Sequence, residues 1–341
     1  MGIFVLLCLL LLLGNSCTFT STDTDLYQFE RDNIIDVRGQ ITEIIGEDVL
    51  IGSNAQVYTL DDYLIVADYK SYMESIHLFS LSDYKAVVSF APIGQGPNEI
   101  ARLGFIGLDR EHREIYVSDH GKQKIFGYNL DSLLATPNYM PFVKYQMEQS
   151  VFPNGYYYMN DTLSIALVIR PTGNYGFNQF TAKWDMEKQT FQQMPYEHPK
   201  VKKKRFSLAV SKNNHIYAEF HSRADLITVC DLEGNLKYNI YGSGWSKERK
   251  RVEYYTKGIF AGDFMVAAYL GDEPFIESKS DGLLNKYPKQ LHIFDIEGNY
   301  IKTLDVGYQI VDFCYDEQNN RLIFNFDDEI QFGYLDLDNV L

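Results

Sequence analysis

The sequence predicts an all-β fold built as a ring of six four-stranded antiparallel units, which is a β-propeller. Three observations point to this class. The 341-residue chain is 15% aromatic, with 26 Tyr and 22 Phe, and these residues favour the half-buried surfaces of strands. Apolar runs of strand length recur about ten residues apart and end in turn residues. Sets of these runs repeat at intervals of roughly 50 residues, which falls within the range of propeller blades.

The N-terminal stretch is typical of an exported protein. Residues Gly2 to Leu13 are uninterrupted apolar, a run well short of the roughly 20 residues that a membrane-spanning helix needs. We therefore expect a signal peptide over residues 1–16. Cys17 follows directly, and we expect cleavage before it and lipid attachment to it. An ordinary signal peptide that leaves Cys17 unmodified, or removes it, is the alternative.

The remainder divides into a tether and one domain. Residues 17–26 are mostly Thr, Ser and Asp with no packing pattern, so we expect a flexible lipoprotein tether there. Residues 27–341 are expected to form one propeller, because the units of a repeat fold bury their faces against each other. We expect this domain to be a monomer.

The units can be placed in order by their acidic turns. The predicted units span residues 56–94, 101–134, 151–196, 205–242, 254–307 and 308–338. An acidic residue closes the third strand of each unit, at Asp83, Asp131, Asp185, Asp231, Asp295 and Asp336. The fifth unit carries a long polar insertion over residues 272–289 between its second and third strands.

The ends of the chain predict how the ring closes. The sixth unit has only three strands, whereas an isolated strand, Ile34 to Ile45, precedes the first unit. That strand ends in Ile45-Gly46, as the fourth strands end in Ile93-Gly94 and Tyr241-Gly242. We therefore expect this N-terminal strand to join the C-terminal blade, which leaves no long unpaired inner edge.

Charge and cysteine content exclude some classes of protein. The formal net charge is -15 and the pI is near 4.9, and such a field repels phosphate backbones, so we expect no nucleic-acid partner. Cys230 and Cys314 lie inside apolar strand patterns and are expected to be buried free thiols, with a disulfide as the alternative.

One face of the ring is expected to carry the site. Connections from second to third strands, and from each blade to the next, share a face of a propeller, and loops on rigid scaffolds carry function. The candidate ligand-binding residues on these connections are Tyr69, Lys70, Arg102, Asp119, His120, Arg170, His221 and Arg223. Residues 95–102, Trp245, Asp272 and Glu273 share this face. Such side chains suit stacking and charged hydrogen bonds. A solvated rim is the alternative.

Two further motifs favour structure over chemistry. In IGQGPNE, Gly94 and Gly96 are expected to adopt positive φ in a turn stiffened by Pro97, with Glu99 and Arg102 paired across the loop. The basic run KVKKKR, Lys200 to Arg205, is expected to be a solvated loop, with contact to anionic lipid or polysaccharide as the alternative.

IGQGPNE, the following IYVSDHGKQKIFGYNLD and the export signal together resemble the six-bladed propeller lipoproteins of Bacteroides-type bacteria. These proteins are relatives in fold of the TolB and NHL-type propellers. The resemblance implies an exported protein, lipid-anchored to the outer membrane on its periplasmic or cell-surface face. The resemblance therefore indicates the cellular compartment and the fold, but gives little information on the ligand or on any reaction.

No catalytic or metal motif is recognisable in the sequence. The seven His are scattered, and HExxH, CxxC, EF-hand and GxSxG patterns are missing. We expect a binding or scaffold module for a glycan, peptide or envelope protein, without catalytic residues, metal or cofactor. A metal-dependent hydrolase or lactonase of the NHL or gluconolactonase-like propeller type is the alternative. It requires carboxylates such as Asp68, Asp119 and Glu219 to converge at the channel.

Overall fold

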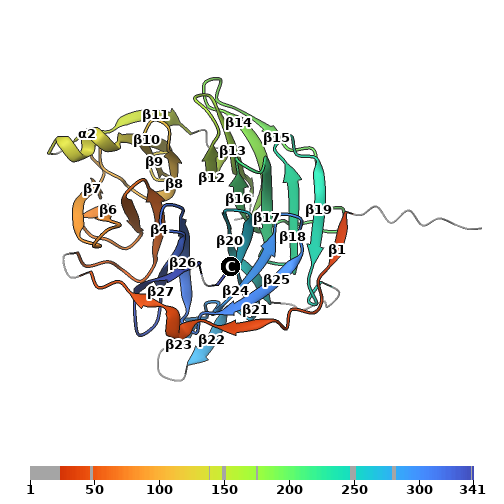
Figure 1. Ribbon diagram of the computed structural model, residues 1–341. Coiled ribbons are helices and arrows are strands. Elements are labelled where there is room, and N and C mark those ends of the chain that lie inside the picture. The colour runs from red at the N-terminus through yellow and green to blue at the C-terminus, as the bar shows by residue number, and fades with distance from the viewer. Residues whose placement is uncertain are drawn as a thin grey trace, which may run out of the picture.

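A computed structural model describes residues 24–46, 49–137, 139–147, 151–173, 176–245, 251–278, 282–338 and 340–341. The expected signal peptide and Cys17 lie outside these residues. Figure 1 shows six sheets arranged around a central axis. The all-β class, the six blades and their four-stranded antiparallel design are confirmed.

Blades 1 to 3 follow the predicted order, with the first strand of each blade nearest the axis (Figure 1). Blade 1 consists of β4 (Ala55–Leu60), β5 (Tyr63–Asp68), β6 (Glu74–Ser80) and β7 (Ala86–Pro92). Blade 2 consists of β8 (Leu103–Asp109), β9 (Glu114–Asp119), β10 (Lys124–Asn129) and β11 (Phe142–Gln146). Blade 3 consists of β12 (Phe152–Tyr158), β13 (Leu163–Gly173), β14 (Gly176–Asp185) and β15 (Thr190–Gln193).

Blades 4 to 6 each take an additional strand from the N-terminal residues. Blade 4 consists of β16 (Phe206–Ser211), β17 (Ile216–His221), β18 (Leu226–Asp231) and β19 (Leu236–Tyr241). Blade 5 consists of β20 (Glu253–Ala261), β21 (Phe264–Asp272), β24 (Gln290–Asp295) and β25 (Tyr300–Asp305). Blade 6 has β26 (Ile310–Asp316), β27 (Arg321–Phe326) and β28 (Phe332–Asp336).

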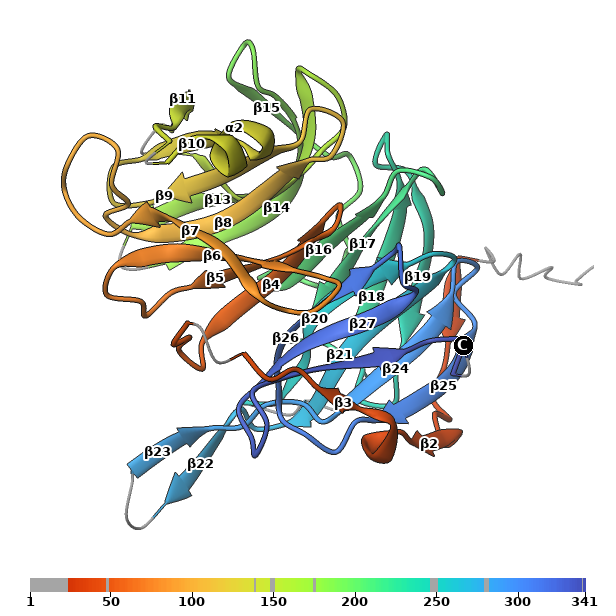
Figure 2. The ribbon, with the colours of Figure 1, turned by 60° about the vertical axis from the view of Figure 1, so that its left-hand side comes forward.

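The N-terminal segment, residues 24–44 and called the strap below, runs along the outside of three blades (Figure 1 and Figure 2). Its strand β1 (Asp25–Tyr27) pairs parallel to β19, and β2 (Ile34–Asp36) pairs parallel to β25. Only β3 (Thr42–Glu43) pairs with β28 and completes blade 6. Closure by an N-terminal strand is therefore confirmed.

The prediction of one continuous strand over Ile34 to Ile45 was wrong. A 3₁₀ turn, η1 (Arg38–Gln40), redirects the chain from blade 5 to blade 6, and the Asp36 carboxylate accepts a hydrogen bond from the Arg38 N–H at its start. Pairing also begins earlier than the expected start of the domain at residue 27, because β1 starts at Asp25.

One arginine fastens the strap between blades 4 and 5. Arg31 Nη1 lies 2.7 Å from the Tyr255 hydroxyl, 3.3 Å from Asp225 Oδ1 and 3.2 Å from His292 Nδ1. The side chains of Arg31 and Asp225 are only 8% and 1% exposed. Burial, together with the adjacent Arg31 cation, lowers the pKa of His292 well below its usual value. The neutral imidazole therefore accepts the arginine hydrogen bond through Nδ1.

The hydrophobic core is divided among the six blade interfaces. The buried apolar residues form six clusters, and each cluster joins two adjacent blades. Between blades 2 and 3, for example, Tyr145 packs edge-on against Trp184 with ring centroids 4.9 Å apart. Each blade is thus stabilised mainly by its neighbours, as in other repeat architectures.

Side chains from three blades meet at the axis. Lys257 of β20 donates a 2.7 Å hydrogen bond to Asp312 of β26, and its ammonium lies 5.7 Å from the centre of the Tyr58 ring on β4. Asp312 also accepts from the Val57 N–H. Burial raises the pKa of Asp312, and the Lys257 ammonium opposes that shift.

Two elements depart from the blade pattern. The short helix α2 (Leu130–Ala135) follows β10, where the sequence suggested only an acidic turn at Asp131. Asn129 caps it by accepting from the Ser132 N–H. The polar insertion of blade 5 forms a hairpin of β22 (Phe275–Ser278) and β23 (Gly282–Asn285), which projects from the ring in Figure 2.

The two cysteines within the described residues are buried and free, as expected. Burial raises the pKa of the Cys230 thiol to about 12 and that of Cys314 higher still, so both thiols stay protonated at neutral pH. In the same part of the chain, we find no helix with the length and hydropathy needed to cross a membrane.

We predict that Arg31→Ala destabilises the ring. Removing one partner of a buried ion pair leaves an uncompensated buried charge and costs about 3–5 kcal/mol of unfolding free energy. Arg38→Ala on the same strap is the matched control, because the Arg38–Glu329 pair is exposed and screened by solvent, so its loss should change the stability far less. Urea unfolding monitored by tryptophan fluorescence measures both. Equal effects would contradict the role of Arg31.

We also predict that acid loosens this contact. His292 has a lowered pKa in the folded chain, so its contribution to stability is present above the unfolded pKa of about 6.5 and is lost as the pH falls below it. His292→Asn keeps an acceptor but does not titrate, so its melting temperature should fall less between pH 7.5 and pH 5.5 than that of the wild type. His112→Asn is the control. Its exposed imidazole has a raised pKa beside Asp109, so this variant should not reduce acid sensitivity.

Candidate functional site

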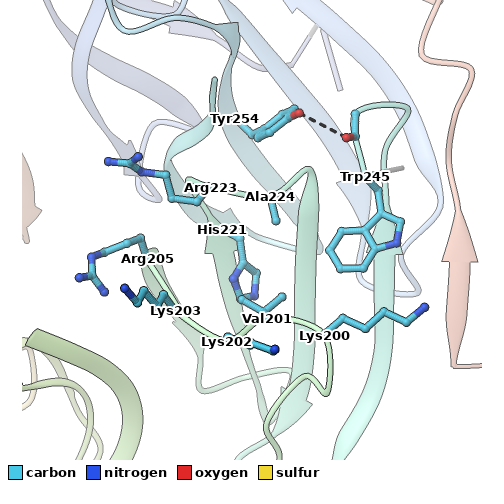
Figure 3. Close-up of a pocket in the computed structure, with 11 residues that line it drawn as sticks. Lys200, Val201, Lys202, Lys203, Arg205, His221, Arg223, Ala224, Trp245 and Tyr254 are labelled. Atoms are coloured by element: carbon cyan, nitrogen blue, oxygen red, sulfur yellow. Dashed lines mark hydrogen bonds between the residues drawn. The ribbon is translucent and has the colours of Figure 1, made fainter. Parts of the chain in front are cut away.

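A cavity of about 310 Å³ lies where three chain connections around blade 4 meet (Figure 3). The connections run from β15 to β16, from β17 to β18 and from β19 to β20, and they belong to the face that the sequence analysis singled out. The lining residues are Lys200, Val201, Lys202, Lys203, Arg205, His221, Arg223, Ala224, Gly244, Trp245 and Tyr254.

The lining is strongly cationic. Five of its side chains are Lys or Arg, and none of the lining residues is Asp or Glu, although the whole chain carries a net charge of -15. Arg205 donates to the backbone carbonyls of Lys204 and Phe177 and lies 3.8 Å from the Phe177 ring centre. The carboxylate of Glu253 interacts with Arg223 from outside the lining. Over the described residues, no carboxylate forms an ion pair with any of these five cations.

Below the cavity, a buried ion pair holds the basic loop in place. Lys204 Nζ lies 3.1 Å from Glu219 Oε2, and both side chains are less than 10% exposed. Thr181 donates a 2.7 Å hydrogen bond to the other carboxylate oxygen of Glu219. The expectation of a fully solvated loop over Lys200 to Arg205 was therefore wrong at Lys204, which anchors the loop to β17.

His221 is buried at the centre of the lining side chains in Figure 3. Its Nε2 lies 3.3 Å from Thr228 Oγ1, which itself donates to Asn239 Oδ1 at 2.9 Å. The Asn239 amide in turn donates to Asp25 of the strap. Because the hydroxyl proton of Thr228 is used on Asn239, Thr228 accepts from His221 and the imidazole carries its proton on Nε2.

The other imidazole nitrogen is left with an unused lone pair. His221 Nδ1 has no hydrogen-bond partner among the described residues. Burial, reinforced by the Lys204 ammonium, lowers the pKa of His221 well below its usual value and keeps the ring neutral. A buried acceptor without a partner is costly unless a ligand or water supplies a donor.

Trp245 borders the cavity on the side opposite Arg205 and Arg223, and Lys200 lies on the same side as Trp245. In the view of Figure 3, Arg205, Lys203 and Arg223 lie on one side of His221, and Trp245 lies on the other. The half-buried indole packs against Tyr241 and His198, with ring centroids 4.9 and 5.2 Å away. Tyr254 donates to the carbonyl of Gly244, whose own N–H donates to Asp225.

The structure brings together only some of the residues predicted for the site. His221 and Arg223 line the cavity with Trp245, which was expected on the same face, and with the basic loop, which was treated separately. The candidates that do not line it are Tyr69, Lys70, Arg102, Asp119, His120 and Arg170. The sequence analysis did not assign the basic loop to the site. The signal that could have done so was a run of basic residues within an acidic chain.

The remaining candidates have contacts of their own. Asp119 accepts four backbone N–H groups, from residues 101, 102, 121 and 122. The Tyr69 hydroxyl lies within hydrogen-bond distance of Gln56 Oε1 and of the Gly104 carbonyl, either of which accepts its one proton, and His120 packs edge-on against Phe152. The exposed candidates are Lys70, Arg102 and Arg170, and the guanidinium of Arg170 lies over the Phe180 ring.

The IGQGPNE motif is a turn, but for a different reason from the one expected. Neither Gly94 nor Gly96 adopts a positive φ. Instead the Glu99 carboxylate folds over both glycines and accepts from the Gly96 N–H at 2.6 Å, where a Cβ on either glycine would collide with it. The predicted pair of Glu99 with Arg102 was wrong, since Glu99 faces the turn itself.

The carboxylates weighed for a metal site do not converge. Asp68 accepts from the N–H groups of Gly52 and Lys70, Asp119 holds the loops of blade 2, and Glu219 pairs with Lys204. No three His, Cys, Asp or Glu side chains within the described ranges are grouped so as to hold a metal ion. The axis carries the Lys257–Asp312 pair instead.

Comparison with known protein families agrees with this architecture. A family model described as a 6-bladed beta-propeller matches residues 29–222, which is more than half of the chain. The chain belongs to this family. No curated protein matches the sequence.

Solved structures share the fold of this six-bladed propeller at low identity. A member of the duf4221 family from Bacteroides vulgatus is 11% identical, with a TM-score of 0.58, covering 90% of this chain and 94% of its own. A putative exported protein from Bacteroides fragilis is 11% identical, with a TM-score of 0.55 and coverages of 89% and 88%. A luciferin-regenerating enzyme is 10% identical, with a TM-score of 0.55 and coverages of 87% and 95%. At these identities the likeness concerns the fold alone.

Proposed function

We propose that this propeller is a binding module of the bacterial cell envelope, and that its cationic cavity captures an anionic group of a glycan, peptide or protein. The observation that carries the proposal is the set of five Lys and Arg side chains around one cavity, with no carboxylate in its lining. Lys200, Lys202, Lys203 and Arg223 are exposed and Arg205 is half-buried, and none of the five forms an ion pair with a carboxylate of the described residues. The cavity is therefore a place where positive charge is left for a ligand.

The surrounding charge makes such a site selective. An acidic protein repels anions over most of its surface, so an anion reaches this molecule favourably only where local cations outweigh that field. Cavities also exclude part of the solvent, which strengthens charge-assisted hydrogen bonds relative to those on an open surface. Binding should weaken as ionic strength rises, because exposed lysines contribute part of the attraction.

Binding without chemistry suits the groups around the cavity. Nucleophilic catalysis needs a hydroxyl or thiol held by a base that is itself oriented from its other side. In the described part of the chain, His221 contacts Thr228 and Glu219 through the same nitrogen, Nε2, so it does not relay between them. Chain connections held by the strands of a rigid blade, with cationic side chains at the rim, are what a binding site requires.

We predict that removing two cavity cations weakens anion binding. Lys203→Ala combined with Arg223→Ala should lower the affinity for inorganic pyrophosphate about thirtyfold, since each lost charge-assisted contact contributes roughly 1 kcal/mol at a partly exposed site. Isothermal titration calorimetry at low salt measures the change.

The matched control removes the same charge elsewhere in blade 4. Lys212→Ala with Lys237→Ala takes two exposed lysines from the β16–β17 turn and from β19, neither of which lines the cavity. Its affinity should stay within twofold of the wild type. Equal losses in both double variants would show that only net charge matters, and absent binding in the wild type would overturn the proposal.

We propose that the module is exported and lipid-anchored at Cys17, on either face of the outer membrane. Support comes from the apolar run before Cys17 and from the likeness to an exported Bacteroides fragilis protein. Mass spectrometry of membrane-extracted protein is expected to show a chain that starts at Cys17 and carries acyl groups. Cys17→Ala should release the protein from the membrane fraction. A chain starting elsewhere, unaffected by this substitution, would rule out the anchor.

A further inference from the structure

We infer that the cavity takes a sugar unit bearing a phosphate or sulfate ester, as found free or in an anionic glycan. This inference rests on the proposed function and specifies its ligand. Three features carry it: the size of the cavity, the placement of Trp245 across from the two arginines, and the unpartnered acceptor of His221.

Size sets the first limit. The cavity volume of about 310 Å³ is at the small end of the roughly 300–1,000 Å³ typical of small-molecule sites. It is about ten times the ~30 Å³ that one water occupies in the liquid, which exceeds what a lone phosphate or sulfate fills. One sugar ring with its ester group matches this volume, whereas a folded protein surface does not enter it.

The cationic side fits an ester anion. Arg223 offers a planar fork of N–H donors, which matches the geometry of phosphate and sulfate oxygens, while Arg205 and Lys203 add positive charge beside it. A phosphate monoester carries about -1.5 to -2 charges at neutral pH, so it satisfies several cations at once. A single carboxylate would leave most of the five unmatched.

The aromatic side fits a sugar ring. Trp245 lies across the cavity from the arginines, and its indole is half-buried, held in place by Tyr241 and His198. One face of a pyranose consists of C–H groups, which pack on a large, rigid aromatic surface at little entropic cost. An inorganic anion has no apolar C–H surface to pack against the Trp245 indole.

His221 requires a hydrogen-bond donor, which a fully ionised ester group does not supply. Its Nε2 proton is committed to Thr228, so Nδ1 is an acceptor, and that acceptor is unpartnered. The free oxygens of a fully ionised phosphate or sulfate ester present lone pairs to a neutral Nδ1, whereas sugar hydroxyls present donors. A ligand with both an ester anion and hydroxyl groups therefore suits cations and imidazole together.

Calorimetric titrations with four probes test the inference: glucose 6-phosphate, glucose 6-sulfate, inorganic phosphate and glucose. Wild-type protein should bind at least one sugar ester about tenfold more tightly than inorganic phosphate, and glucose only weakly. In Trp245→Ala the sugar esters should lose most of that advantage, while the affinity for inorganic phosphate stays within twofold. Trp245→Phe keeps an aromatic face and should retain most of it.

Arg223→Ala should weaken sugar esters and inorganic phosphate alike. Melting temperatures of all variants confirm that they are folded, and Trp245→Phe covers the case in which Trp245→Ala does not fold. Inorganic phosphate binding as tightly as the sugar esters, or phosphoserine binding more tightly than them, would overturn the sugar assignment and leave the anion-binding function standing. Failure of every anion to bind would instead overturn the proposed function itself.

Discussion

The contact between Arg31 and Asp225 ties ring closure to the candidate site. Asp225 lies on the β17–β18 connection, accepts from the strap through Arg31, and accepts from the N–H of Gly244 in the lining of the cavity. Tyr255 and Tyr269 of blade 5 donate to the same carboxylate. One buried anion thus orients the strap, two blades and one wall of the cavity. Such a group is costly to desolvate, and it persists because several donors satisfy it at once.

A second chain of hydrogen bonds reaches the cavity from the strap. Asp25 of β1 accepts from Asn239, Asn239 accepts from Thr228, and Thr228 accepts from His221. An acceptor-only carboxylate at one end therefore fixes the direction of every donor up to the imidazole. The strap adds only three hydrogen-bonded residue pairs to blade 4, yet it determines which nitrogen of His221 carries the proton.

The repeat pattern could be predicted from the sequence because the strands of one blade are neighbours in the chain. Runs such as Tyr63–Asp68 and Glu74–Ser80 pair with their neighbours in the chain, so alternation and turn residues suffice to place them. For the strap, only the pairing of β3 could be predicted from the sequence. The strands β1 and β2 are three residues long and pair in parallel with distant strands, so no local pattern marks them. The cavity needed three connections to be brought together, which periodicity does not encode. Lys204 shows the limit most clearly, because its burial depends on Glu219 of β17, whereas the other lysines of the run are exposed.

The strap also sets an order of events for the growing chain. Asp25 pairs with Asn239, Ile34 with Thr303, and Thr42 with Tyr334, so the first part of the domain to be synthesised waits for the last. Blades 1 to 3 contain all of their own strands and can form as hairpins while synthesis continues. Closing contacts of such long sequence separation slow folding, because the entropy of a large loop must be overcome before they form. Until the strap pairs with them, the outer edges of blades 4, 5 and 6 remain uncovered, and premature pairing with another chain competes for them.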